Sequence, residues 1–397
     1  MNPGGDPGVS PRPLALHRCV GDVEAFLREH WGRWPLHHRS GDGFDDLLSL
    51  ESLDHILTTM SLRLPAFRLV MDGTTLPTSS YTKSGRTGSQ PVTGFVDPPR
   101  MYELFRQGAT IVLQGVHRFW PPVAGLSRHL DLALGHPTQV NAYVTPPGSR
   151  GLAVHRDTHD VFVLQAFGSK HWDAWAPGSP VADAAAGADP VLSVELQPGE
   201  SLYLPVNTPH AARTQDVVSG HLTVGIQSTS WGDVLREVAR RVADDEAFAE
   251  RLPAAFHEDP EAFATAVRDR LEELLLRLGK VDPGDVARAR IRSFLTSRPS
   301  AIDGTLAGLI ELGSITDTTA VRRREGTVCV LMADGDHLLA LLGDRELRMP
   351  GELMDVMRFV AEQTRFRTVD LGAFLDPESR VVLVRRLVRE GLLEVTR

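Results

Sequence analysis

Three ionisable residues stand at alternate positions in the stretch "HRDTHDVFVLQAF": His155, Asp157 and His159. In a β-strand, residues two positions apart project from the same face, so the His155 and Asp157 side chains can reach one point. A second histidine would complete the two-histidine, one-carboxylate set that holds non-haem Fe(II) and leaves coordination positions open. The apolar run that follows predicts burial, where such groups are costly unless something neutralises them. The spacing therefore predicts a metal site, although an isolated pair of this kind is more often a surface feature.

The third ligand is sought among three downstream histidines, His171, His210 and His221. We favour His210, because "LYLPVNTPHAA" predicts a strand and a Pro/Asn turn that returns the ring to the mouth of a barrel. His221 begins the next predicted strand and stays a candidate, whereas His171 follows a turn and is expected to point away from Lys170. His159 shares the face of the predicted ligands, so both a place near the metal and a hydrogen-bonded core position are open to it.

Lysine is rare in this chain, because only Lys83, Lys170 and Lys280 occur among 42 basic residues. Lys170 follows His155 by fifteen residues, across a predicted hairpin at "FGS". An ammonium on the neighbouring strand could bind one carboxylate of a cosubstrate whose other end chelates the metal. The alternative is a solvated lysine beside a turn.

The elements that must position these residues change in type along the chain. Residues 139–226 read as short β-branched or aromatic strands separated by Gly, Pro and Asn turns, which predicts a sandwich or barrel. Three helices follow Trp231, and Asp259–Pro260 and Asp282–Pro283 are start signals for the second and third. From about Thr327 strand-like and helical segments mix, which suggests a small winged-helix-like module. The predicted segments are a disordered N-terminus over 1–14, a barrel domain over 15–230, a helical region over 231–300 and the winged-helix-like domain over 301–397.

Composition narrows the class of protein. The formal net charge of −9 argues against a protein that coats nucleic acid, and the two cysteines are too few for a disulfide framework. No apolar run is long enough for a membrane helix, and the Gly/Pro-rich start lacks the basic and apolar parts of a signal peptide. We therefore expect a cytoplasmic protein with no membrane partner and without direct nucleic-acid binding.

The motifs between Asn141 and Gln227 resemble those of the JmjC/cupin-type ribosomal oxygenases, which are 2-oxoglutarate- and Fe(II)-dependent protein hydroxylases. The resemblance rests on "NAYVTPPGSRGLAVHRDTHDVFVLQAFGSKHW", "LYLPVNTPHAA" and "HLTVGIQ". It implies a mixed α+β fold with a double-stranded β-helix (the cupin/JmjC jelly roll), a helical dimerisation region and a winged-helix C-terminal domain. It also implies a homodimer and the cosubstrates 2-oxoglutarate and O₂.

The resemblance also assigns site residues. It implies that His155, Asp157 and His210 hold the iron and that Lys170 binds the distal carboxylate of 2-oxoglutarate. It places two further polar residues in the cosubstrate pocket, Asn141 and Thr223. The chain departs from the family at Arg156, where an aromatic residue is usual, and at the turn "PVNTPH", which replaces a Pro-Arg-Gly type of turn. Both departures bear on the substrate groove.

The sequence thus predicts a dioxygenase that hydroxylates a side chain of a protein, with a ribosomal protein as the expected substrate. Within the same chemistry, hydroxylation of a biosynthetic peptide or histone demethylation stays open. Two readings from other classes are a non-oxidative metal-dependent cupin, which would not need Lys170, and a ligand-sensing DNA-binding regulator. The acidic balance of the C-terminal module disfavours the regulator, because DNA readers usually carry a basic footprint.

Overall fold

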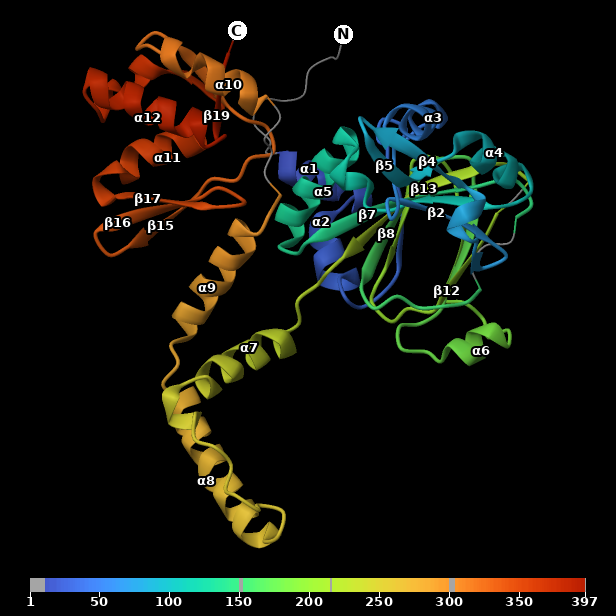
Figure 1. The fold of residues 1–397 in the computed structure, drawn as a ribbon, viewed down its shortest axis with the longest axis horizontal. Helices are drawn as coiled ribbons and strands as arrows, with labels where there is room; N and C mark the ends of the chain where they lie inside the picture. The colour runs from blue at the N-terminus through green and yellow to red at the C-terminus, as the bar shows by residue number, and fades with distance from the viewer. Residues whose placement is uncertain (1–10, 150–152, 215, 300–303, 397) are drawn as a thin grey trace. The chain divides into compact units, whose positions relative to one another are not determined.

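The computed structural model describes residues 11–149, 153–214, 216–299 and 304–396, and it divides the chain into two compact units, Met1–Ser228 and Thr229–Arg397. The first unit contains the predicted barrel (Figure 1). Its larger sheet is antiparallel and eight-stranded, in the order β1 (Leu36–Arg39), β11 (Glu200–Leu204), β8 (Asp160–Phe167), β13 (Ser219–Ile226), β7 (Thr138–Thr145), β6 (Thr110–Leu113), β2 (Phe67–Met71) and β3 (Thr74–Thr75). The smaller sheet is β10 (Leu192–Leu196), β9 (Lys170–Ala174) and β12 (His210–Thr214).

The two sheets pack through a small apolar core. It is formed by Val161, Val163, Leu202 and Leu204 of the large sheet and by Trp172, Ala174 and Leu196 of the small one. On β8 the alternate residues, Phe162, Leu164 and Ala166, enter the main core on the other face. Because β8 is covered on both faces, nearly all of its residues are buried, which explains the unbroken apolar run in the sequence.

Helices cover the outer face of the large sheet. They are α1 (Pro11–Val20), α2 (Val23–Ala25), α3 (Leu50–Thr59), α4 (Pro98–Arg106) and α5 (Pro121–Leu134), while the short α6 (Val181–Ala185) follows β9. Helices α1 and α5 lie side by side, and α5 also contacts β7 (Figure 1). The jelly-roll expectation is therefore confirmed for the barrel.

Two sequence expectations need correction. Helix α1 begins at Pro11, so residues 11–14 are helical where disorder was predicted, and residues 1–10 lie outside the described residues. The predicted single strand through His155 and Asp157 is also wrong, because β8 begins only at Asp160. His155 makes an isolated bridge to His210 instead, and the residues up to β8 form a loop.

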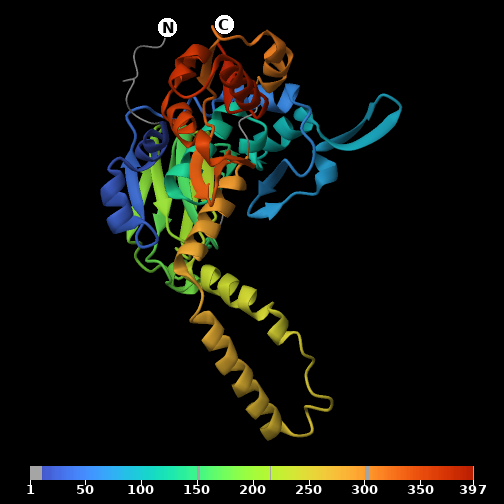
Figure 2. The same cartoon turned by 90° about the vertical axis from the view of Figure 1, so that its left-hand side faces the viewer.

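A hairpin of β4 (Thr82–Thr87) and β5 (Gln90–Val96) projects from the rest of the first unit (Figure 2). The Arg63 guanidinium lies over the Phe95 ring at its base, 5.5 Å from the centroid. The hairpin carries Lys83, which is exposed and lies outside the barrel.

The second unit begins with the predicted helices, α7 (Trp231–Ala243), α8 (Pro260–Leu278) and α9 (Pro283–Thr296). Asp259 and Asp282 cap α8 and α9, each with a proline in the first turn, as the sequence predicted. These helices expose large apolar side chains: Trp231, Leu235, Leu271, Leu275, Leu276 and Ile291. No helix among the described residues is long and apolar enough to cross a membrane.

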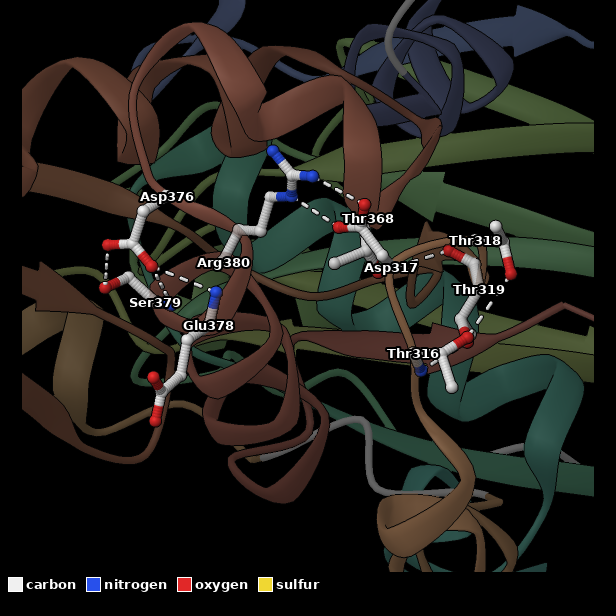
Figure 3. Close-up of polar contacts among 9 residues, drawn as sticks. All are labelled: Thr316, Asp317, Thr318, Thr319, Thr368, Asp376, Glu378, Ser379 and Arg380. Carbon is white, nitrogen blue, oxygen red and sulfur yellow. Dashed lines mark hydrogen bonds and ion pairs between the residues drawn. The ribbon is translucent and has the colours of Figure 1, made fainter.

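The remainder of the second unit has its own core. Two three-stranded sheets, β18-β14-β19 and β15-β16-β17, accompany the helices α10 (Thr305–Glu311), α11 (Met354–Glu362) and α12 (Pro377–Arg389). The strands are β14 (Ala320–Arg323), β15 (Val330–Asp334), β16 (His337–Leu341), β17 (Glu346–Pro350), β18 (Arg365–Arg367) and β19 (Leu393–Val395). Figure 3 shows Arg380 of α12 in a two-pronged ion pair with Asp317, while Asp376 caps the start of the helix. This pair ties α12 to the loop that precedes β14.

Candidate metal centre

His155, Asp157 and His210 come together at one end of the barrel. Their potential ligand atoms lie within 4.8 Å of one another. Among the described residues, these three form the group of histidine, cysteine or acidic side chains that is close enough to hold a metal ion. The His210 Nε2 atom is 3.8 Å from Asp157 Oδ2, and the two imidazole ring centroids are 4.3 Å apart. Two neutral imidazoles and a carboxylate at such separations fit a divalent first-row metal ion.

The backbone holds this group in place. The His155 amide donates to the His210 carbonyl at 3.1 Å, and the His210 amide donates to the His155 carbonyl at 2.8 Å. The Asn207 amide donates to the Asp157 carbonyl at 3.1 Å, and Asn207 itself has a left-handed φ of 61° in the turn before β12. The Pro/Asn turn therefore returns the chain to His155, as the sequence suggested.

The two imidazoles are oriented for ligation. Nδ1 of His155 lies 2.9 Å from the Ala153 carbonyl, and Nδ1 of His210 lies 2.9 Å from the Thr208 carbonyl. Each Nδ1 carries the proton in these bonds, so each Nε2 has a free lone pair for a metal. Burial and the neighbouring His155 lower the pKa of His210, which favours its neutral form.

The cavity beside the triad contains a buried cation, Lys170 of β9. Its side chain is 5% exposed, and its Nζ donates to Thr145 Oγ1 at 3.3 Å. No carboxylate among the described residues lies within ion-pair distance of this ammonium, and burial lowers the pKa of Lys170 to about 8. A buried, unpaired ammonium is costly unless an anionic ligand accompanies it.

Two further buried nitrogen atoms in the cavity lack a hydrogen-bond partner. Nδ1 of His221 and Nε1 of Trp172 are buried without a hydrogen-bond partner in the described structure. His221 stacks on Tyr143 with ring centroids 5.2 Å apart, and burial together with the Lys170 charge lowers its pKa well below the usual value. His221, left open by the sequence, thus lines the cavity, although it is not in the triad.

Of the two residues predicted to line the cosubstrate pocket, one lies at the cavity and the other does not. Thr223 lines the cavity, and Asn141 is its partner across β13 and β7. The Asn141 side-chain oxygen Oδ1 accepts a hydrogen bond from the Gly115 amide at 3.0 Å. Asn141 is not among the residues that line the cavity.

Two candidate histidines lie elsewhere. His171 is on the opposite face of β9 from Lys170, where it contacts Asp173 and Ser193. His159 precedes β8, and its ring lies against Gly225 of β13, whose missing Cβ leaves it room. Neither residue lines the cavity.

Sequence reasoning missed three residues that line the same cavity: Arg68, Asp72 and Tyr143. Arg68 and Asp72 come from the β2–β3 hairpin, about seventy residues or more before the motifs. Only the pairing of β2 with β6 and of β6 with β7 brings them to the site. The signal in the sequence was Arg68 itself, a charged residue within the apolar strand "FRLVM".

Comparison with known proteins supports this geometry. Residues 125–234 match the family model described as the JmjC domain. A protein called ribosomal oxygenase 1 from Gallus gallus is 30% identical over 300 residues, which cover 68% of this chain and 48% of that protein. The bifunctional lysine-specific demethylase and histidyl-hydroxylase NO66 of Aedes aegypti is 29% identical over 230 residues, 54% of this chain and 34% of that protein. The chain thus spans about half, or less, of these relatives' lengths.

Solved structures share the fold over nearly the whole chain. The ribosomal oxygenase YcfD of Escherichia coli aligns with 95% of this chain and 99% of its own, with a TM-score of 0.56 and 17% identity. A YcfD structure in complex with cobalt and 2-oxoglutarate aligns with a TM-score of 0.54 and 15% identity, over 95% of this chain and 98% of its own. At this identity the likeness shows the fold alone.

The fold and the matched residues define the class: the first unit is a two-sheet jelly roll, and most of the residues that match the JmjC domain, 125–234, lie in it. Within that class, the chain is similar to the ribosomal oxygenases, as the sequence motifs indicated.

Proposed function

We propose that the chain is an Fe(II)- and 2-oxoglutarate-dependent dioxygenase that hydroxylates a side chain of a protein substrate. The observation that carries the proposal is the unpaired ammonium of Lys170, buried in the same cavity as the two-histidine, one-aspartate group. A dianion that chelates a metal at one end satisfies both features. The relatives named for this chemistry support the same reading.

The residues divide into two groups in this proposal. His155, Asp157 and His210 would hold the iron through two Nε2 atoms and a carboxylate. The Lys170 ammonium, with the Trp172 indole N–H and with His221 in its Nδ1-protonated tautomer, would bind carboxylate oxygens of 2-oxoglutarate. Fe(II), 2-oxoglutarate and O₂ together supply oxidative hydroxylation of a C–H bond when bound. The chain's own contribution is to orient these groups and to exclude water from the buried end of the cavity.

The competing classes lack an observation of equal weight. A non-oxidative cupin would use the triad but would leave Lys170 buried and unpaired throughout its reaction. A DNA-binding regulator would require a basic surface on the C-terminal part, where many arginines are already paired with acidic residues, as in Arg380–Asp317, Arg322–Glu394 and Arg345–Asp344.

The substrate we propose is a ribosomal protein. The relative from Gallus gallus and the Escherichia coli protein YcfD are both named as ribosomal oxygenases, and ribosomal proteins are basic, which suits a chain with a formal net charge of −9. The chain differs from the ribosomal oxygenase motifs at Arg156 and in the turn before His210, both beside the metal site. Because these differences bear on the substrate groove, a biosynthetic peptide is the alternative substrate.

We also propose that the 231–300 region forms a homodimer. Its helices expose Trp231, Leu235, Leu271, Leu275 and Leu276, more apolar surface than isolated helices carry in water. Replacing Leu271 and Leu275 by glutamate should halve the mass measured by light scattering, whereas Lys83→Glu on the β4–β5 hairpin should leave it unchanged. A wild-type chain that is monomeric at high concentration would contradict this part.

The function itself is tested by anaerobic titration of the Fe(II)-loaded chain with 2-oxoglutarate, following the visible metal-to-ligand charge-transfer band. We expect a band in the wild type, its loss in Asp157→Ala, and its retention in His171→Ala, whose histidine lies outside the triad. Succinate should then form when air is admitted. A folded, iron-loaded chain that shows no band would refute the oxygenase and favour the non-oxidative cupin.

A further inference from the structure

A single row of side chains crosses the floor of the cavity. Arg68 on β2 pairs with Val112 on β6, Val112 with Tyr143 on β7, and Tyr143 with His221 on β13. All four residues line the cavity. Because residues in register on adjacent strands project from the same face, the row runs along the cavity from His221, near Lys170, to Arg68.

Arg68 is half-buried and has few partners. Its guanidinium donates to Thr75 Oγ1 at 3.3 Å and lies near the Tyr143 hydroxyl. No carboxylate of the described residues lies within ion-pair distance of it; Asp72, the nearest acidic residue along the hairpin, is exposed at the rim and forms no ion pair with it. The positive charge of Arg68 therefore faces the cavity without a counter-charge.

Tyr143 stacks on His221 in this row, and Arg68 and Asn141 lie near its hydroxyl. Asn141 is anchored through its side-chain oxygen to the Gly115 amide. The Tyr143 hydroxyl is close enough to Asp157 for the two groups to interact electrostatically, and a phenol hydroxyl can donate to a bound acceptor. Two donors, the Arg68 guanidinium and the Tyr143 hydroxyl, thus converge beside the metal site.

We propose that Arg68 and Tyr143 select the target residue: they admit a neutral side chain that carries a hydrogen-bond acceptor, and Arg68 repels lysine, methyl-lysine and arginine. The inference rests on the proposed function. With Fe(II), the Asp157 carboxylate, the 2-oxoglutarate dianion and the Lys170 ammonium in place, the formal charges sum to zero. Of the two further charged residues that line the cavity, Asp72 is exposed to solvent whereas Arg68 is half-buried, so the charge of Arg68 is the less screened of the two. Two like charges a few ångströms apart in a half-buried site repel each other strongly.

The relatives' names make the choice concrete, because one of them joins a lysine-specific demethylase with a histidyl-hydroxylase. The charge of Arg68 favours targets of the second kind in this chain and disfavours the first. Arg68 acts by positioning and exclusion, so its replacement should change which substrate binds rather than whether the cosubstrate does.

The test uses the anaerobic Fe(II)·2-oxoglutarate complex of the full chain and four acetylated, amidated pentapeptides, Gly-Gly-X-Gly-Gly, where X is histidine, asparagine, lysine or arginine. At pH 8 the histidine peptide is neutral, and peptide binding is followed by the shift of the charge-transfer band. For the wild type we expect the two neutral peptides to bind about tenfold or more tightly than the two cationic ones. Arg68→Glu should reverse that order, and Arg68→Lys should preserve it.

Arg63→Gln is the matched control, because it removes one positive charge on the neighbouring surface, where Arg63 bonds the Thr93 carbonyl outside the cavity. Its peptide order should equal that of the wild type. A wild type that does not distinguish neutral from cationic peptides, or that binds none of them, overturns the assignment, as does an Arg68→Glu variant with the wild-type order. Absence of the charge-transfer band itself would instead contradict the proposed function.

Discussion

Replacing Lys170 by methionine should weaken the binding of 2-oxoglutarate while making the free protein more stable. Methionine has a similar length and an apolar end, so it fills the space of the lysine without its charge. In the free protein the ammonium is buried with only Thr145 Oγ1 as a partner, and burial lowers its pKa from 10.5 to about 8.

Both magnitudes follow from that burial. A folded-state pKa lowered from 10.5 to about 8 means that the protonated lysine costs the fold about 3 kcal/mol below pH 8. Lys170→Met removes this cost and should raise the free energy of unfolding at pH 7 by up to about 3 kcal/mol. Leaving the distal carboxylate buried without its cation should cost the complex about 3 kcal/mol, or a roughly 150-fold rise in Kd.

The assay pairs urea unfolding of the metal-free chain with titration of the charge-transfer band. Lys83→Met, on the exposed β4–β5 hairpin, is the matched control and should change neither quantity by more than about twofold or 0.5 kcal/mol. A Lys170→Met variant that loses stability, or that binds 2-oxoglutarate as tightly as the wild type, would show that the ammonium has another counter-charge and does not bind the cosubstrate.

Other outcomes follow from the same cavity and fold. The Kd for 2-oxoglutarate should rise as the pH rises above about 8, approaching tenfold per pH unit, because the lowered pKa leaves Lys170 neutral and binding must first protonate it; a flat profile from pH 7 to 10 in the titration would contradict this. His221→Phe, which keeps the stacking on Tyr143, should weaken 2-oxoglutarate about tenfold by removing one donor, and an unchanged Kd would exclude His221 from the contact. Gly168→Ala should lower the stability by about 3 kcal/mol or prevent folding, because its φ is +60° and an added Cβ would lie 1.7 Å from the Val218 carbonyl oxygen. Gly178→Ala is its control in thermal melts, with φ +84° and open space around the added carbon.

Sequence patterns located one half of the site well. The residues that approach one another, His155, Asp157 and His210, were found from their spacing and from the turn that precedes the third. The reason why they meet differs in part from the predicted one, because residues at alternate positions can lie in a loop as well as in a strand. The residues meet because His155 and His210 share a backbone bridge, not because one strand carries the first two.

The other half of the site depends on strand register, which the sequence does not display. Arg68 reaches the cavity because β2 pairs with β6 and β6 with β7, and a shift of one residue would turn its side chain into the core. The unpaired state of His221 depends likewise on its neighbours across β7 and β8. Local patterns find motifs on one strand, whereas a row across four strands needs the assembled sheet.

The reciprocal bonds between His155 and His210 also bear on metal choice in the cell. The two proposed nitrogen ligands, 55 positions apart in the chain, are joined by main-chain hydrogen bonds that require no ion, so the triad is in place before any metal arrives. A preformed set of two imidazoles and a carboxylate follows the general affinity order of first-row ions, in which cobalt, nickel, copper and zinc all bind more tightly than ferrous iron. The metal ion that the triad binds then depends on which ions are available in the medium. A chain purified in the presence of a trace of zinc would therefore carry zinc.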